Sequence, residues 1–162
     1  MTTYVYPQPE WPDASAELYD EGFEKKLAAL SGKFGFQIGA EPDWGIEEEV
    51  YLSMILEAGK LVEFKSCSKD YAHDTSDYIM GATPQAWKRI LTKKDKFVGA
   101  FMGGRVKLEK GDTVGALALG PHANTLVDVI TQVELTFPDD LSPEALETFK
   151  ADFTKSRSER GI

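Results

Sequence analysis

The sequence predicts an α+β fold, in which a mainly antiparallel sheet of five strands is covered by helices. Two patterns support this class. Val50, Leu52, Met54 and Leu56 alternate along a predicted strand, whose other face is also partly apolar at Tyr51 and Ile55. The turn Ala58-Gly59-Lys60 leads to a returning strand at residues 61–67, which indicates an antiparallel hairpin. Apolar residues recur at helical spacing near the start of the chain and again in its second half, so helices are expected on both sides of the strand-rich part.

The first half of the chain is expected to supply four of the five strands. Residues 1–12 contain three prolines and are expected to run extended. A helical pattern then begins at Asp13 and can end at Gly32. A polar loop is expected over residues 68–77. The four strands are predicted at residues 34–38, 50–56, 61–67 and 78–82.

The second half is expected to be mostly helical. Thr83 can cap a helix that begins at Pro84, because proline is tolerated in the first turn. Residues 105–110 alternate as the fifth strand. Helices are predicted over 121–133 and 142–154, the latter as a C-terminal helical extension that docks through Leu146, Phe149 and Phe153. We therefore expect one domain over residues 13–155, an extended segment over 1–12 and a frayed tail over 156–162.

Length, composition and charge exclude several classes of protein. The 162 residues suit one globular domain, and no apolar run reaches the length of about 18 residues that a membrane span needs. The net charge of −9 argues against general nucleic-acid binding, which requires a cationic surface. One cysteine, Cys67, forms no internal disulfide, and residues 1–13 do not resemble a signal peptide, so a cytoplasmic location is expected.

Candidate catalytic groups do not form a recognisable constellation. Neither His73 nor His122 is spaced to activate Cys67, and the set His73, Asp74 and Asp77 has few nitrogen or sulfur ligands for a metal. The glycines match no nucleotide-binding motif. We therefore expect no enzyme activity, no cofactor and no metal.

Two features of residues 82–130 leave alternatives open. Residues 82–111 contain eight basic residues and only two acidic ones, Asp95 and Glu109. The basic residues form either a solvated surface or a site for an anion. Phenylalanine, methionine and aliphatic residues are also concentrated between Phe97 and Ile130. They either complete a core or line a pocket for an apolar ligand.

Three segments resemble the sterol carrier protein 2 domain. They are residues 77–80, residues 83–91 and the stretch Phe97-Val98-Gly99-Ala100-Phe101-Met102-Gly103-Gly104-Arg105-Val106-Lys107-Leu108-Glu109-Lys110-Gly111-Asp112. The last resembles the family pattern Ala-Phe-x-x-Gly-Lys-x-Lys-Ile-x-Gly-Asp, with Arg105 in place of the usual lysine. The resemblance implies a five-stranded sheet, helices over a hydrophobic tunnel, and non-catalytic binding of sterols, fatty acids or acyl-CoA. The end of the chain carries no peroxisomal Ser-Lys-Leu signal.

The resulting prediction is a non-catalytic carrier of a lipid-like molecule. The expected tunnel lining is Trp87, Phe97, Phe101, Met102, Val106, Leu108, Leu126 and Ile130. The expected rim for an anionic head group is Lys88, Arg89, Arg105 and Lys107. Two alternatives remain: a small enzyme, or an accessory subunit that presents a hydrophobic substrate to a partner enzyme; and a structural protein with a filled core.

Overall fold

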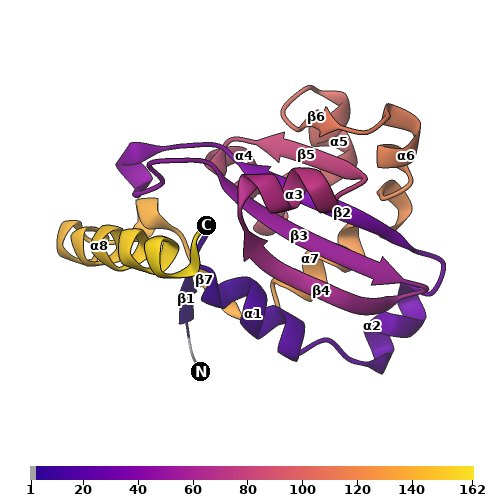
Figure 1. Ribbon diagram of the computed structural model, residues 1–162, viewed down its shortest axis with the longest axis horizontal. Helices are drawn as coiled ribbons and strands as arrows, with labels where there is room; N and C mark the ends of the chain where they lie inside the picture. Colours follow the sequence, from indigo (N-terminus) through magenta and orange to yellow (C-terminus); the bar gives the residue numbers. More distant parts are fainter. Residues whose placement is uncertain (1–2) are drawn as a thin grey trace.

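The computed structural model describes residues 3–162 and is built on a five-stranded sheet in the order β4-β3-β2-β5-β6 (Figure 1). Strands β2 and β5 pair in parallel, and the other three neighbouring pairs are antiparallel. This confirms the predicted α+β class with its mainly antiparallel sheet. The strands are β2 (Gly32–Ile38), β3 (Val50–Glu57), β4 (Lys60–Cys67), β5 (Tyr78–Ala82) and β6 (Lys107–Lys110).

The hairpin of β3 and β4 turns where the sequence indicated. Ala58 and Gly59 both have positive φ, at 48° and 83°. A Cβ at Gly59 would lie 2.3 Å from the carbonyl oxygen of Glu24, so only glycine fits between this turn and the helix that passes it.

Most helices cover one face of the sheet. Their side chains join those of the sheet in one apolar core, to which Trp11, Leu27, Trp87, Phe97 and Leu126 contribute. The helices of this layer are α1 (Glu10–Glu17), α2 (Glu21–Lys26), α4 (Pro84–Leu91), α5 (Phe97–Met102), α6 (Thr113–Leu117) and α7 (Ala123–Ile130). The predicted cap of α4 is present, because the Thr83 hydroxyl accepts a hydrogen bond from the Ala86 amide at 3.1 Å.

The opposite face of the sheet carries α3 (Lys69–Thr75) and a smaller apolar cluster of Tyr51, Cys67, Ala72 and Ile79. Figure 1 shows α3 in front of the sheet and α7 behind it. Successive strand residues point to opposite faces, so Leu52 and Tyr51 serve different layers.

The two ends of the chain form a separate edge of the molecule. Strand β1 (Thr3–Val5) pairs in parallel with β7 (Glu134–Thr136), and α8 (Pro143–Arg160) lies beside them. Phe149 and Phe153 are buried and stack on each other with their ring centroids 5.3 Å apart. Three short 3-10 turns complete the chain, at Pro42–Trp44, Gly120–His122 and Pro138–Asp140. No helix within residues 3–162 is long and apolar enough to cross a membrane.

Three expected boundaries need correction. Helix α1 begins at Glu10, within the segment expected to be extended. Pro12 does not prevent this, because it falls in the first turn of the helix, where an amide proton has no helical partner. The expected loop 68–77 contains α3, capped by Ser68. The expected frayed tail 156–162 is helical through Arg160, whose guanidinium lies 3.0 Å from the Asp13 carboxylate. Met1 and Thr2, within the expected extended segment, lie outside the described residues.

Candidate apolar binding site

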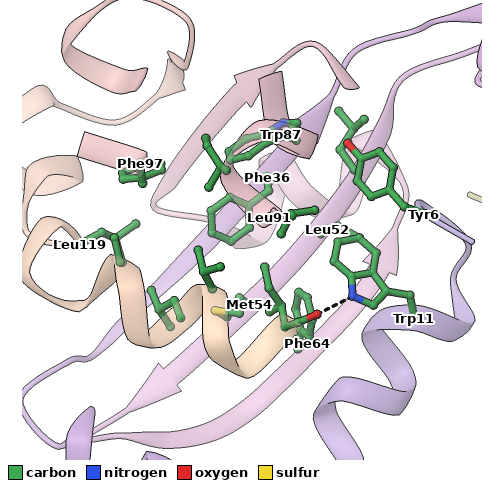
Figure 2. A pocket seen from close by; sticks show the side chains of 16 residues that line it. Tyr6, Trp11, Phe36, Leu52, Met54, Phe64, Trp87, Leu91, Phe97 and Leu119 are labelled. Atoms are coloured by element: carbon green, nitrogen blue, oxygen red, sulfur yellow. Dashed lines mark hydrogen bonds between the residues drawn. The ribbon is translucent and has the colours of Figure 1, made fainter. Parts of the chain in front are cut away.

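A cavity of about 60 Å³ lies between the sheet and the helices that cover it (Figure 2). Strands β2, β3 and β4 form its floor, and helices α1, α4, α5 and α7 form its walls. The lining residues are Tyr6, Trp11, Phe36, Ile38, Leu52, Met54, Phe64, Trp87, Ile90, Leu91, Phe97, Leu119, Ala123, Leu126, Val127 and Ile130.

The central strand shows where the cavity opens. Phe34, Phe36 and Ile38 all point from β2 toward the helices, yet only Phe36 is half-buried, whereas Phe34 and Ile38 are 3% and 2% exposed. The Phe36 ring meets Trp87 edge-on, with centroids 5.9 Å apart. A central strand residue that remains half-buried marks a gap in the helix layer above it.

Three aromatic side chains in the lining carry a polar group, and each of these groups is hydrogen-bonded to a backbone carbonyl. Trp11 Nε1 donates to the Ile130 oxygen at 2.7 Å, a bond drawn in Figure 2. Trp87 Nε1 donates to the Gln37 oxygen at 2.8 Å, and the Tyr6 hydroxyl donates to the Pro84 oxygen at 3.3 Å. Burial raises the pKa of Tyr6 well above its ordinary value, so the phenol remains protonated. These bonds fix the orientation of the three aromatic rings and satisfy their polar groups, so the interior of the cavity is apolar.

The cysteine and the histidines that the sequence offered as catalytic candidates lie outside the cavity. Cys67 faces the opposite side of the sheet, and burial raises the pKa of its thiol to about 12, so the reactive thiolate is scarce. His73 lies on α3, where its Nδ1 is 2.9 Å from the Lys69 carbonyl oxygen. Within residues 3–162, no three histidine, cysteine, aspartate or glutamate side chains group as metal ligands. In the described part of the chain, the lining of the cavity is apolar and contains no aspartate, glutamate, histidine or cysteine.

The structure brings four of the eight expected lining residues to the cavity: Trp87, Phe97, Leu126 and Ile130. The other four lie elsewhere. Phe101 is one helical turn after Phe97 and packs against that ring from outside the cavity. Met102 is 71% exposed.

The position of strand β6 explains why the other two expected lining residues, Val106 and Leu108, do not reach the cavity. Strand β6 is the edge strand of the sheet, farthest from β4, so the residues at its start lie beyond the cavity. Val106 is buried in the core, and Leu108 is half-buried on this edge.

Sequence reasoning missed the contribution of the first dozen residues and of the strands. The alternation in β2 and β3 did indicate one apolar face, which includes Phe36, Leu52 and Met54. Tyr6 and Trp11 have no periodic pattern around them. Only their tertiary contacts, such as the Tyr6–Trp11 ring pair at 5.6 Å, place them in the wall.

The expected basic rim for an anionic head group is not assembled around the cavity. Lys88 lies 2.9 Å from Asp139 and 3.2 Å from Asp140, and Arg89 lies 2.9 Å from Asp95. Arg105 is also near Asp95, at 3.6 Å. Lys107 is exposed on β6. Three of the four cations are therefore neutralised by carboxylates, and none of the four lines the cavity.

Comparison with known proteins identifies the fold. A solution structure of a conserved hypothetical protein from Thermus thermophilus, described as a possible sterol carrier protein, matches with a TM-score of 0.66 and 22% identity, over 78% of this chain and 88% of that one. A crystal structure of sterol carrier protein 2 matches with a TM-score of 0.64 and 23% identity, over 78% and 97%. No family model and no curated protein matches the sequence. The chain therefore has the sterol carrier protein 2 fold.

Proposed function

We propose that this protein binds one apolar, lipid-like molecule in the cavity between its sheet and helices, and carries it without catalysis. The observation that supports this most directly is the interior itself. Its three polar side-chain groups are bonded to carbonyl oxygens, so it offers no hydrogen bond to water but ample contact to a hydrocarbon. Fatty acids, acyl-CoA and sterols are the ligand classes that this interior suits.

The cavity must widen to take such a ligand. An apolar cavity of about 150 Å³ holds a molecule as small as benzene, and the cavity here measures about 60 Å³. Val127 and Ile130 line the cavity from α7 and are half-buried, whereas the strands beneath are held by their ladder hydrogen bonds. Outward movement of α7 and its neighbours is the motion that would admit a hydrocarbon chain.

The proposal also includes the cellular location of the protein and its binding partner. The only cysteine is buried and free, which suits a reducing compartment, so we place the carrier in the cytoplasm. Its partner is the lipid-like ligand, with no nucleic acid.

The test is ligand binding by a variant that fills the cavity. Val127→Phe should lower the affinity for a fluorescent fatty acid by at least about tenfold, because the added ring occupies space in the cavity that Val127 lines. Val114→Phe is the matched control, since Val114 is 82% exposed and does not line the cavity. Native mass spectrometry of the purified wild type should also show a bound lipid. Absence of both a bound lipid and fatty-acid affinity would favour a structural protein with a filled core.

A further inference from the structure

Helix α5 presents an uncharged, partly apolar outer face. It contains no charged residue, and two glycines follow it. Two large apolar side chains of α5 are exposed, Met102 by 71% and Val98 by 37%. Gly99 and Gly104 have no atom within 4 Å of the position of a Cβ, so this face is open to its surroundings.

Basic residues precede and follow this helix in the sequence. Between residues 93 and 107 the chain has five basic residues and one acidic residue, in a protein whose net charge is −9. Lys94, Lys96 and Lys107 are exposed and form no ion pair within residues 3–162. The single carboxylate, Asp95, is already engaged by Arg89 and Arg105.

The inner side of the same helix belongs to the cavity. Phe97 is 7% exposed and lines the interior, whereas Val98 follows it on the outside. One short helix therefore separates the apolar interior from the exposed apolar face. Figure 1 places α5 at the end of the molecule away from α8.

From these observations we propose that the outer face of α5, with Lys94, Lys96 and Lys107, docks on the surface of an anionic phospholipid bilayer. Exposed methionine and valine side chains enter the region between head groups and acyl chains, and the lysines meet the lipid phosphates. This inference rests on the proposed function only for the purpose of docking. In a lipid carrier, docking would bring the cavity wall at Phe97 next to a source of lipid.

The charge distribution would orient the protein on such a surface. Residues 1–81 contain 16 acidic and 6 basic residues, so an anionic bilayer repels most of that half. The cations around α5 are attracted, and α5 then faces the lipid.

The experiment measures binding of the full chain to vesicles of phosphatidylcholine alone and of phosphatidylcholine mixed with phosphatidylglycerol. Wild type should bind the mixed vesicles, bind phosphatidylcholine weakly, and lose binding as salt is raised. The double variant Lys94→Glu/Lys96→Glu should bind the mixed vesicles at least about tenfold more weakly, since each lysine near an anionic membrane is worth about a fivefold change in affinity. Met102→Ser should weaken binding less, by about threefold, because one partly inserted side chain is lost.

The matched control is Lys25→Glu/Lys26→Glu on α2, which changes the net charge equally at another exposed lysine pair. It should change vesicle binding by less than about twofold. Equal losses in the two double variants would overturn the proposal, as would a wild type that binds neither vesicle.

Fatty-acid binding in solution separates this proposal from the proposed function. The Lys94→Glu/Lys96→Glu variant should retain wild-type fatty-acid affinity. Val127→Phe should lose fatty-acid affinity and still bind anionic vesicles. Vesicle binding without any fatty-acid binding would support docking and contradict the carrier. The reverse result would support the carrier and overturn docking.

Discussion

The two faces of the sheet are built from the same strands and have opposite properties. On the face toward the helices, Leu52, Met54 and Phe64 border a hollow. On the face toward α3, the Glu63 carboxylate accepts hydrogen bonds from Ser53 Oγ at 2.7 Å and from the Tyr71 hydroxyl at 2.8 Å. The first face has unfilled volume, whereas the second has paired polar groups.

A second carboxylate repeats this pattern on the α3 face. Glu49 accepts hydrogen bonds from Gln37 Nε2 at 2.8 Å and from the Tyr51 hydroxyl at 2.7 Å. Hydrogen bonds have narrow geometric limits, so they hold this face in one arrangement. Apolar contacts have no such directionality, so they constrain the helix face less. The comparison shows that directional hydrogen bonds hold one face of the sheet, whereas apolar packing around a hollow covers the other.

The largest expected effect comes from enlarging the hollow. Leu52→Ala, at a residue only 3% exposed, should reduce the free energy of unfolding by about 2–5 kcal/mol, because hydrocarbon contacts are lost and the space refills only in part. Urea denaturation measures this. Addition of a fatty acid should restore part of the loss, since a ligand that binds only the folded state stabilises it.

The control for this substitution is Val62→Ala on β4, where the side chain is 55% exposed. It should alter stability by no more than about 0.5 kcal/mol. A Leu52→Ala variant as stable as this control would contradict the assignment of Leu52 to a packed wall.

A smaller effect is expected on the α3 face. Tyr71→Phe removes the hydroxyl that donates to Glu63 and should lower the free energy of unfolding by about 1 kcal/mol. Fatty-acid affinity should not change, because the residue lies across the sheet from the cavity. Thermal unfolding and ligand titration of the same sample test both statements, and a loss of affinity would mean that the two faces are coupled.

The smallest effect is a pH dependence from Glu49. Hydrogen bonds from Gln37 and Tyr51 lower the pKa of its carboxyl below the usual 4.5. The ionised form is therefore favoured in the folded state, and its stabilising contribution is present above pH 4.5 and lost as the pH falls through the lower, folded-state pKa. Unfolding measured between about pH 6 and 3 should show a shallower loss of stability for Glu49→Gln than for wild type. Identical slopes would argue against this hydrogen-bonded carboxylate.

The elements that the sequence predicted correctly are those with local signals. The β3–β4 hairpin follows from the alternating residues Val50, Leu52, Met54 and Leu56 and from the turn Ala58-Gly59-Lys60, and α4 follows from the Thr83 cap and Pro84. Helix α3 was missed because it buries only Ala72, so it lacks an apolar stripe. Its start signal is the Ser68 hydroxyl, which accepts from the Tyr71 amide at 3.1 Å.

The candidate site was predicted in half of its detail. Trp87, Leu126 and Ile130, which were named from helical spacing, line the cavity together with Phe97. Phe97 and Met102 were both named from one apolar segment and from the family resemblance, without a predicted helix. Met102 lies five residues after Phe97 and therefore turns to a different side of α5.

What the sequence by itself determined is the alternation that gives β2 and β3 an apolar face toward the helices, together with the helix caps. These depend on neighbours a few residues apart. The tertiary structure alone decided which apolar residues surround a hollow and which fill the core, as between Phe97 and Val106. It also paired Trp11 and Trp87 with distant carbonyl groups, 119 and 50 residues away along the chain. Packing between such distant segments leaves no periodic trace in the sequence, because it depends on how whole layers meet.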